Sequence, residues 1–333
     1  MTYSFNDADL KAPYGPLAFF LDLHPDLGDF KTDVIEGFSR PQKSLSPMYF
    51  YDERGSKLFN KITELDEYYP TRTERSVFSE HANAITEAIG AGAAVFEYGS
   101  GSSEKIEWLL SGLETPVAYV AMDISKDHLI ESASALTEPL NVPVAAVCAD
   151  FHGAVAIPKH ILPAADQWLG FFPGSTIGNM TPQEAQTFLD NAATTLGAPA
   201  KLLVGVDLEK DKAVLEAAYD DAEGVTAEFN LNLLRRMKRE LGADIALEDF
   251  EHLAFYNEAD ARIEMHLRAR RATTIALDGA RFDFAEGETL HTENSHKFTL
   301  ERLKTMIAPT PWRFETAWTD PKGWYAACLL SNS

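Results

Sequence analysis

The sequence predicts an α/β protein built on a doubly wound, largely parallel sheet. Short apolar runs alternate with amphipathic segments through the central part of the chain, a pattern typical of that fold class. A glycine turn follows the run that starts at Val95, and three successive runs finish beside the acidic residues Glu97, Asp123 and Asp150. Ligands of such sheets bind beyond the carboxyl ends of the strands, so these residues mark one candidate binding edge.

The turn itself reads as a strand, then Gly99, Ser100 and Gly101, then a helix over Ser102–Gly112 that carries Lys105. Glycine lets the backbone approach a ligand closely, and a helix start offers free N–H groups and a positive dipole end. Two glycines alone have little specificity, and the third glycine of the dinucleotide-binding pattern is missing. The glycines and the helix start lead us to expect a ligand cradle here. The missing third glycine disfavours a nicotinamide-dependent oxidoreductase.

Asp123 ends a second apolar run, Ala118–Met122, roughly 20 residues beyond Gly101, where an acidic group is placed to accept hydrogen bonds from ribose hydroxyls. Asp150 follows a third run, Val142–Val147, and could serve an adenine amine. Acidic residues at successive strand ends suit a nucleoside ligand. They suit a cationic nucleoside better than a polyphosphate. An alternative stays open, in which these aspartates only cap the helices that follow.

The alternation continues beyond Asp150. Trp168–Phe172 and Leu202–Val206 are predicted as strands, and Pro182–Leu196 as a helix with Thr181 as its N-cap and proline at its first position. Gly174 and Asn179 lie in the loop after the first of these strands. We expect them where a second substrate would meet the nucleoside.

The alternation of strands and helices stops after Leu208. If the last strands of the chain rejoin the sheet, the segment Leu208–His296 is an insertion into the sheet domain. The elements expected from here on are helices over Ala213–Ala222, Val225–Leu241 and Phe298–Met306, a strand over Ile263–Ala269, a hairpin over Thr274–Phe284, and closing strands over Trp312–Thr319 and Trp324–Leu330.

The amino-terminal part is predicted to hold helices over Asp29–Gly37, Gly55–Ile62 and Glu74–Ala91. Between them, in sequence that reads as loop, lie four tyrosines, Tyr49, Tyr51, Tyr68 and Tyr69. Tyrosines can line a pocket, because each ring offers an apolar face, a hydroxyl and a quadrupole that attracts cations. Composition alone favours ordinary packing for them.

Composition narrows the function classes. The 333 residues include 29 basic and 51 acidic side chains, a formal charge of −22, which disfavours nucleic-acid binding. Cys148 and Cys328 lie in apolar runs and are predicted to be buried thiols without a disulfide. The first residues lack a signal-peptide pattern and no apolar run is long enough to cross a membrane, so we expect a cytoplasmic protein without a membrane partner.

One short stretch, His291 to His296, contains two histidines and Glu293. Its spacing matches no usual zinc pattern and no further ligand cluster is evident, so we expect no metal.

Six ordered motifs between about Tyr49 and Phe298 resemble the histidine Nα-methyltransferases of ergothioneine biosynthesis, a family of class I S-adenosylmethionine (SAM)-dependent methyltransferases. The motifs are Tyr68–Glu74, Glu97–Lys105, Gly174–Asn179, Tyr219–Asn230, Arg262–Met265 and Glu293–Ser295.

The resemblance implies a Rossmann-like, SAM-binding methyltransferase domain over residues 75–208 and 297–333. It also implies an α+β substrate-binding domain over 1–74 and 209–296. The positions that match cofactor contacts are Gly99, Ser100, Gly101, Lys105, Asp123, Asp150 and Phe151.

On the substrate side, the resemblance assigns Asn179, Tyr219 and Tyr68 to the carboxylate and backbone of the amino acid, with Gly174 beside them. It assigns Glu293 and Ser295 to the imidazole, with Met265 packed by the ring. Tyr51, Tyr68 and Asn179 are the candidate catalytic residues, and either Tyr51 or water could remove the amine proton.

The function implied is trimethylation of the α-amino group of L-histidine to hercynine, the first step of ergothioneine biosynthesis, by a monomer that uses SAM as co-substrate. Two alternatives stay open. One is methylation of another amino acid, which would share the scaffold and change only the residues that face the ring. The other is a non-catalytic SAM sensor, which would not need the residues that match substrate contacts.

Overall fold

The computed structural model describes residues 2–3, 8–25, 28–101, 103–151 and 153–333. Contacts divide the chain into two compact units. The first unit comprises Met1–Leu27, Thr73–Leu208 and Phe298–Ser333, and the second comprises Gly28–Arg72 and Glu209–Lys297. No helix among the described residues has the length and apolar character needed to cross a membrane.

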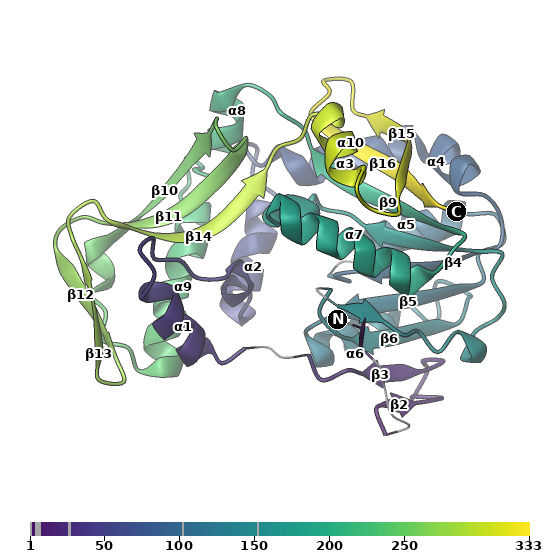
Figure 1. Ribbon diagram of the computed structural model, residues 1–333, viewed down its shortest axis with the longest axis horizontal. Coiled ribbons are helices and arrows are strands. Elements are labelled where there is room, and N and C mark those ends of the chain that lie inside the picture. The colour runs from purple at the N-terminus through teal and green to yellow at the C-terminus, as the bar shows by residue number, and fades with distance from the viewer. Residues whose placement is uncertain (1, 4–7, 26–27, 102, 152) are drawn as a thin grey trace. The chain divides into compact units, whose positions relative to one another are not determined.

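A nine-stranded sheet forms the first unit, in the order β15-β16-β9-β8-β4-β5-β6-β3-β2 (Figure 1). Its strands are β2 (Leu10–Lys11), β3 (Phe20–Asp22), β4 (Ala93–Tyr98), β5 (Ala118–Asp123), β6 (Val144–Cys148), β8 (Gln167–Phe172), β9 (Ala200–Asp207), β15 (Arg313–Thr319) and β16 (Tyr325–Asn332). A separate two-residue ladder joins β1 (Thr2–Tyr3) to β7 (Ala154–Val155).

The strands from β3 to β9 pair in parallel, whereas β16 is antiparallel to β9. The doubly wound prediction is therefore confirmed. The chain runs from β4 to β5 and β6 on one side, then returns to β8 and β9 on the other, so the strand order reverses at β4 and β8. That reversal is where such sheets open a crevice for ligands.

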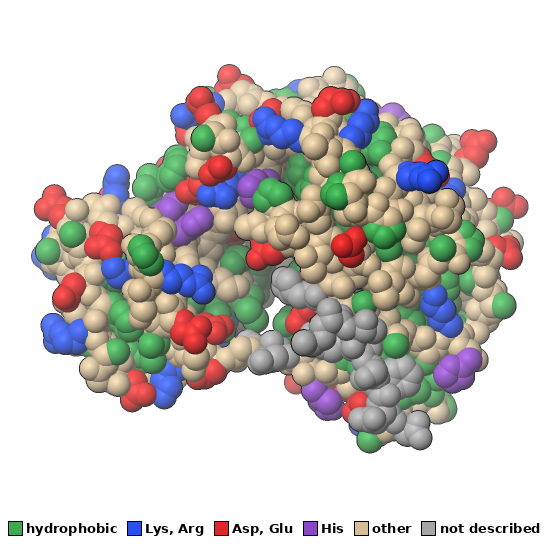
Figure 2. Space-filling model, in the orientation of Figure 1, with side chains coloured by type: hydrophobic (Ala, Val, Ile, Leu, Met, Phe, Trp, Pro, Cys, Tyr) green, Lys and Arg blue, Asp and Glu red, His purple; other side chains and the backbone are tan. Residues whose placement is uncertain are grey.

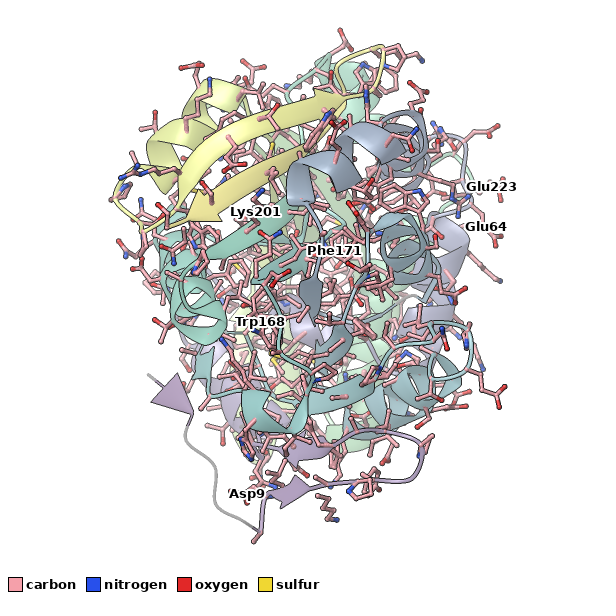
Figure 3. The ribbon with its side chains drawn as sticks, turned by 90° about the vertical axis from the view of Figure 1, so that its right-hand side faces the viewer. Asp9, Glu64, Trp168, Phe171, Lys201 and Glu223 are labelled. Atoms are coloured by element: carbon pink, nitrogen blue, oxygen red, sulfur yellow. The ribbon has the colours of Figure 1, made fainter. Side chains whose placement is uncertain are left out.

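Helices cover both faces of this sheet because alternate residues of each strand point to opposite sides. One face packs against residues of α3 (Tyr69–Glu80), α4 (Ala82–Ile89), α5 (Ser103–Gly112) and α6 (Lys126–Ala135), and the other against α7 (Pro182–Leu196) and α10 (Leu300–Ile307). Trp168 and Phe171 of β8 illustrate the alternation, since they belong to the cores on opposite faces (Figure 3). Short 3-10 turns occur at η2 (Lys159–Ile161) and η3 (Thr176–Asn179).

The second unit contains a three-stranded antiparallel sheet, β10-β11-β14, with the long helix α9 packed on it. Its elements are α1 (Phe30–Phe38), η1 (Pro47–Phe50), α2 (Glu53–Ile62), α8 (Lys212–Ala217), α9 (Val225–Leu241), η4 (Leu247–Asp249), β10 (Phe250–Asn257), β11 (Arg262–Ala269), β12 (Thr273–Leu277), β13 (Ala280–Phe284) and β14 (Thr289–His296).

Local signals predicted several elements closely. The helices α7 and α9 have the predicted bounds, and α7 begins with a capping box in which Thr181 and Glu184 bond reciprocally. The hairpin β12–β13 turns at Asp278 and Gly279, both with positive φ. Cys148 and Cys328 are free and buried, as predicted. Ser102, the expected first residue of α5, lies outside the described residues.

Three expectations differ from the structure. Residues 8–25 were assigned to the second domain, yet β3 pairs with β6 and places this segment in the first unit, because β6 would otherwise expose an unpaired edge. The stretch Tyr69–Glu74 is not loop but the start of α3, and Glu74–Ala91 forms two helices, α3 and α4. The helix expected to reach Ala222 ends at Ala217.

Candidate functional site

The glycine turn after β4 presents its backbone to open space. Gly99 has a φ of +73°, a conformation that side chains disfavour, and a Cβ placed on it would meet no atom within 4 Å. Its N–H and that of Ser100 both donate to the carbonyl of Met122, at 2.9 Å. The turn is thus anchored to β5 on one side and open on the other.

Glu97 lies buried beneath the turn. The hydroxyl of Tyr119 donates to its carboxylate at 2.5 Å and lies 3.1 Å from the Ser100 hydroxyl. Burial is the main cause that raises the pKa of Glu97 to about 7, although the Tyr119 bond acts in the opposite direction. Glu97 therefore supports the glycine turn from the protein interior and does not face the open side of the turn.

The two other strand-end carboxylates follow the neighbouring strands. Asp123 closes β5 and accepts the N–H of Ser125 at 2.8 Å, and burial raises its pKa. Asp150 comes two residues after β6, and Phe151 packs edge-on against Phe172, with ring centroids 5.8 Å apart. Because β4, β5 and β6 are adjacent and parallel, the structure brings Gly99, Asp123 and Asp150 to one edge of the sheet, as predicted.

A buried carboxylate that sequence reasoning did not select connects this edge to its surroundings. Glu74 of α3 forms an ion pair with Lys105 of α5, accepts the N–H of Gly174 at 2.6 Å, and accepts the hydroxyl of Tyr325 at 2.5 Å. It is 1% exposed. Its only sequence signal is membership of the Tyr68–Glu74 motif, which says nothing of these partners.

The loop after β8 carries the remaining predicted residues of the first unit. Gly174 has a φ of +78° and, like Asn179 at the end of η3, is exposed. Ser175 holds the loop to β9, since its hydroxyl accepts the N–H of Asp207 at 2.9 Å. Both predicted residues therefore follow the carboxyl end of β8, next to the point where the strand order reverses.

The second unit has an open pocket that encloses about 300 Å³ when the adjoining open solvent is included. It is lined by Tyr51, Phe59, Ile62, Tyr68, Ala218, Tyr219, Thr226, Phe229, Met265 and Glu293. Four of the predicted substrate residues, Tyr68, Tyr219, Met265 and Glu293, thus meet in one place with the candidate catalytic residue Tyr51. Composition had favoured ordinary packing for Tyr51 and Tyr68. The remaining lining residues, Phe59, Ile62, Ala218, Thr226 and Phe229, were not predicted as site residues. Thr226 and Phe229 lie in the Tyr219–Asn230 motif, whereas Phe59 and Ile62 are apolar helix residues without a sequence signal that separates a pocket from a core.

Aromatic rings form much of the wall. Tyr68 and Tyr219 meet edge to face with centroids 6.2 Å apart, and Phe59 contacts Tyr51 and Tyr68 in the same way, at 5.7 and 6.4 Å. Ring faces of this kind attract cationic groups. Tyr51 as a whole residue is 49% exposed, but desolvation of its hydroxyl, together with the charge of Glu293, raises the pKa of Tyr51, so its phenol stays protonated at neutral pH.

A β-bulge in β14 decides which side chains enter the pocket. Met265 of β11 pairs with Glu293, but the next residue, His266, pairs with His291, which leaves Thr292 as an extra residue. The Thr292 hydroxyl donates towards the Asn230 side-chain oxygen and the Met265 carbonyl, both at 2.9 Å. Glu293 and Met265 consequently lie opposite each other, both lining the pocket.

Glu293 is the acidic residue of this pocket. Burial raises its pKa to about 7, and the positive charge of Lys297 acts in the opposite direction. Ser295, two residues on, is buried and lies 2.8 Å from the hydroxyl of Tyr219. A carboxylate beside hydroxyls and aromatic rings can accept an N–H from a small planar ligand.

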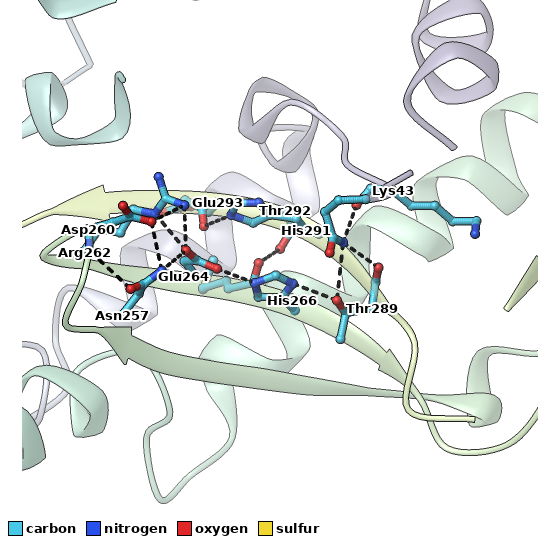
Figure 4. Close-up of polar contacts among 12 residues, drawn as sticks. Lys43, Asn257, Asp260, Arg262, Glu264, His266, Thr289, His291, Thr292 and Glu293 are labelled. Atoms are coloured by element: carbon cyan, nitrogen blue, oxygen red, sulfur yellow. Dashed lines mark hydrogen bonds and ion pairs between the residues drawn. The ribbon is translucent and has the colours of Figure 1, made fainter. Parts of the chain in front are cut away.

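Among the described residues, Glu264, His266 and His291 form one group with metal-ligand chemistry (Figure 4). His266 bonds Glu264 at 3.0 Å and Thr289 at 3.1 Å, and Glu264 is paired with Arg262 at 2.7 Å. The two imidazole rings are stacked with their centroids 4.5 Å apart and an interplanar angle of 11°, and one ligand atom from each of the three residues lies within 4.8 Å of the other two. This arrangement fits a hydrogen-bonded network, and the bulge separates His291 from the pocket residue Glu293.

Charged side chains of both signs are interspersed on the face shown in Figure 2. The basic run on α9 is engaged locally, because Arg235 pairs with Glu228, Arg236 with Glu240, and Arg239 with Asp52. This pattern is typical of a solvated helix face.

Comparisons with known proteins identify the family of this chain. A family model described as histidine-specific, SAM-dependent methyltransferase matches residues 30–332. The histidine N-alpha-methyltransferase of Mycolicibacterium smegmatis is 42% identical over 308 residues, covering 90% of this chain and 94% of that protein. The Mycobacterium tuberculosis protein of the same name is 39% identical, covering 91% and 94%.

A third relative, ergothioneine biosynthesis protein 1 of Neurospora crassa, is 29% identical over 92% of this chain and 35% of its own length. The family match starts at residue 30, earlier than the motifs indicated, and spans both units. The chain therefore belongs to the histidine-specific, SAM-dependent methyltransferase family.

Proposed function

We propose that this protein transfers methyl groups from SAM to the α-amino nitrogen of L-histidine three times and so produces hercynine, the first intermediate of ergothioneine biosynthesis. The observation that carries the proposal is the pocket of the second unit, where Glu293 and Met265 lie opposite each other among tyrosines. The carboxylate would accept an imidazole N–H while Met265 packs against the ring. Phenylalanine would leave that buried carboxylate unpaired, which favours histidine.

The first unit fits the cofactor. The open backbone at Gly99 allows close approach of a nucleoside, Asp123 would accept the ribose hydroxyls, and Asp150 with Phe151 would hold the adenine. Lys105, a partly buried cation that is paired with Glu74, would bind the cofactor's carboxylate. When bound, SAM supplies an electrophilic methyl group on a sulfonium.

The other site residues of this chain would orient the substrate. Asn179, Tyr68 and Tyr219 would hold the carboxylate and backbone of histidine, and Ser295 would join Glu293 at the imidazole. An amino acid anchored at both ends leaves its amine free to turn between transfers, and aromatic faces tolerate the growing positive charge on nitrogen. Because the Tyr51 phenol stays protonated, we propose that water accepts the amine proton.

Mass spectrometry of a reaction containing purified protein, SAM and an equimolar mixture of the twenty amino acids tests the proposal. We expect one product, histidine plus three methyl groups. Methylation of a different amino acid alone would refute the roles of Glu293 and Ser295. Cofactor binding without any methylation would favour a SAM sensor.

Three further points stay predictions: that the enzyme is a monomer, that it is cytoplasmic, and that it needs no metal. Light scattering of the pure protein tests the first, cell fractionation the second, and activity after exhaustive chelation the third.

A further inference from the structure

Lys297 is a buried cation next to the residues proposed to face histidine. It is 2% exposed, and its ammonium group donates to the Ser295 hydroxyl at 2.8 Å and to the Tyr219 hydroxyl at 3.0 Å. The same ammonium lies 4.7 Å from the centre of the Tyr219 ring. Since the two hydroxyls are 2.8 Å apart, the three groups form a closed triangle within the second unit.

This triangle restricts the direction of the hydroxyl protons. An ammonium group only donates, so both hydroxyl oxygens must accept from Lys297. One hydroxyl proton forms the bond between Tyr219 and Ser295, whichever of the two donates. The other hydroxyl proton then points out of the triangle, so the pair acts as a donor towards its surroundings.

Lys297 also lies close enough to Glu293 to influence its ionisation. Burial favours the neutral carboxyl and the charge of Lys297 favours the carboxylate. Among the described residues that line the pocket, the other titratable groups beside Glu293 are the phenols of Tyr51, Tyr68 and Tyr219, and a phenol is ordinarily uncharged near pH 7. Lys297 is therefore a nearby charge that shifts Glu293 towards its hydrogen-bond-accepting carboxylate form.

We propose that Lys297 is a positioning residue that sets the polarity of the histidine pocket, holding the Tyr219–Ser295 pair as a hydrogen-bond donor and Glu293 as an acceptor. This proposal rests on the proposed function. A pocket with one acceptor and one donor matches the neutral imidazole ring, which has one N–H and one unprotonated nitrogen. It also matches the carboxylate of the amino acid, which only accepts.

The test compares histidine binding by the wild type, Lys297→Met and Lys297→Gln, by calorimetry from pH 6 to pH 9. The methionine variant removes both charge and donor, so we expect histidine affinity to fall about 10-fold or more at pH 8. Glutamine keeps a donor without the charge. We expect it to bind near wild-type strength at pH 9, where Glu293 is ionised anyway, and to lose affinity as the pH falls to 7.

In a plot of histidine affinity against pH, affinity falls at the acidic end; we call this part the acidic limb. In both variants the acidic limb should move to higher pH, because the Lys297 charge that favours the Glu293 carboxylate is gone. Titration of free histidine is common to all three proteins, so the difference between profiles reports on the pocket. In the Glu293→Gln background the limb should no longer move. A merely structural lysine would leave the limb in place in every variant, and that result would overturn the proposal.

Failure of the proposed function is recognised separately. If the wild type neither binds nor methylates histidine, the function is wrong. If the wild type does both and the Lys297 variants bind histidine equally well at every pH, only the role of Lys297 is wrong. Cofactor affinity serves as the folding control, since Lys297 lies in the second unit, and should stay within about 2-fold. If the methionine variant does not fold, the glutamine variant and its pH profile decide.

Discussion

At the scale of single residues, the Glu293 carboxylate combines a proposed role in binding with a cost in stability. Its pKa in the folded protein is about 7 against an ordinary 4.5, because burial penalises the charged form. A raised carboxyl pKa means that folding favours the protonated form. Its contribution to stability is therefore present below about pH 4.5 and is lost as the pH rises through 7.

The first prediction concerns Glu293→Gln. The amide removes the penalty for burying a charge, so we expect the variant to melt at a higher temperature than wild type at pH 8, with a smaller gap at pH 5. Its kcat/KM for histidine should fall about 10-fold or more, since the imidazole loses a charged acceptor. Calorimetric melting at several pH values and initial rates measure both effects. A stability gap that does not change with pH would contradict this account.

A second prediction tests Asp123, whose carboxylate ends β5. We expect Asp123→Ala to weaken SAM binding about 10-fold or more, because the ribose hydroxyls lose a charged acceptor. Asp127→Ala is the matched control, as this residue is exposed in the first turn of α6 and has no proposed contact with SAM. Titration calorimetry with SAM measures the difference, and equal affinities in the two variants would remove Asp123 from the site.

At the scale of secondary structure, the bulge in β14 orients the pocket. Side chains alternate along a strand, so one extra residue reverses the face of everything beyond it. Without Thr292 as an extra residue, His291 would lie on the face of Glu293. The bulge instead stacks His291 on His266 and leaves Glu293 opposite Met265.

The third prediction is that Thr292→Val loosens this bulge. Valine has nearly the same shape but cannot donate to Asn230 or to the Met265 carbonyl, which leaves buried acceptors unpaired. We expect a loss of about 1–3 kcal/mol in the free energy of unfolding, measured with urea, and a higher KM for histidine. Thr274→Val, which removes a bond to Asp283 in the hairpin, should change stability by only about 0.5 kcal/mol. Equal effects of the two substitutions would show that the bulge needs no anchor.

At the scale of the whole molecule, Glu74 links parts of the first unit that are remote in sequence. Its partners Gly174 and Tyr325 are 100 and 251 positions away, and Lys105 belongs to the helix after the glycine turn. One buried carboxylate thus fixes α3, α5, the loop after β8 and the strand β16. A proposed cofactor ligand, Lys105, and the loop that carries Asn179 depend on the same anchor.

The fourth prediction is that Glu74→Gln destabilises the protein by about 2 kcal/mol, because a charged acceptor of three donors becomes neutral. SAM affinity should fall as well, since Lys105 loses its partner. Glu80→Gln provides the control on the same helix, where an exposed glutamate accepts from Ser76. Chemical denaturation and calorimetry test both parts, and unchanged SAM binding would disconnect Glu74 from the cofactor site.

The sequence by itself determined the fold class, the helices α7 and α9, the hairpin β12–β13 and the family. These follow from local information: hydrophobic period, proline and capping residues at helix starts, glycine where φ is positive, and ordered motifs. Each of these signals extends over only a few residues, so it can be recognised in the amino-acid sequence.

Only the tertiary structure decided how the side chains are used. The bulge at Thr292, the Glu74 anchor, the triangle around Lys297 and the pairing of β3 with β6 each depend on groups brought together by folding. A buried carboxylate or lysine is stable only where its partners surround it, and those partners are set by strand register and packing instead of sequence distance. For that reason the sequence could nominate Glu293 as a candidate but could not show that Lys297 lies near it.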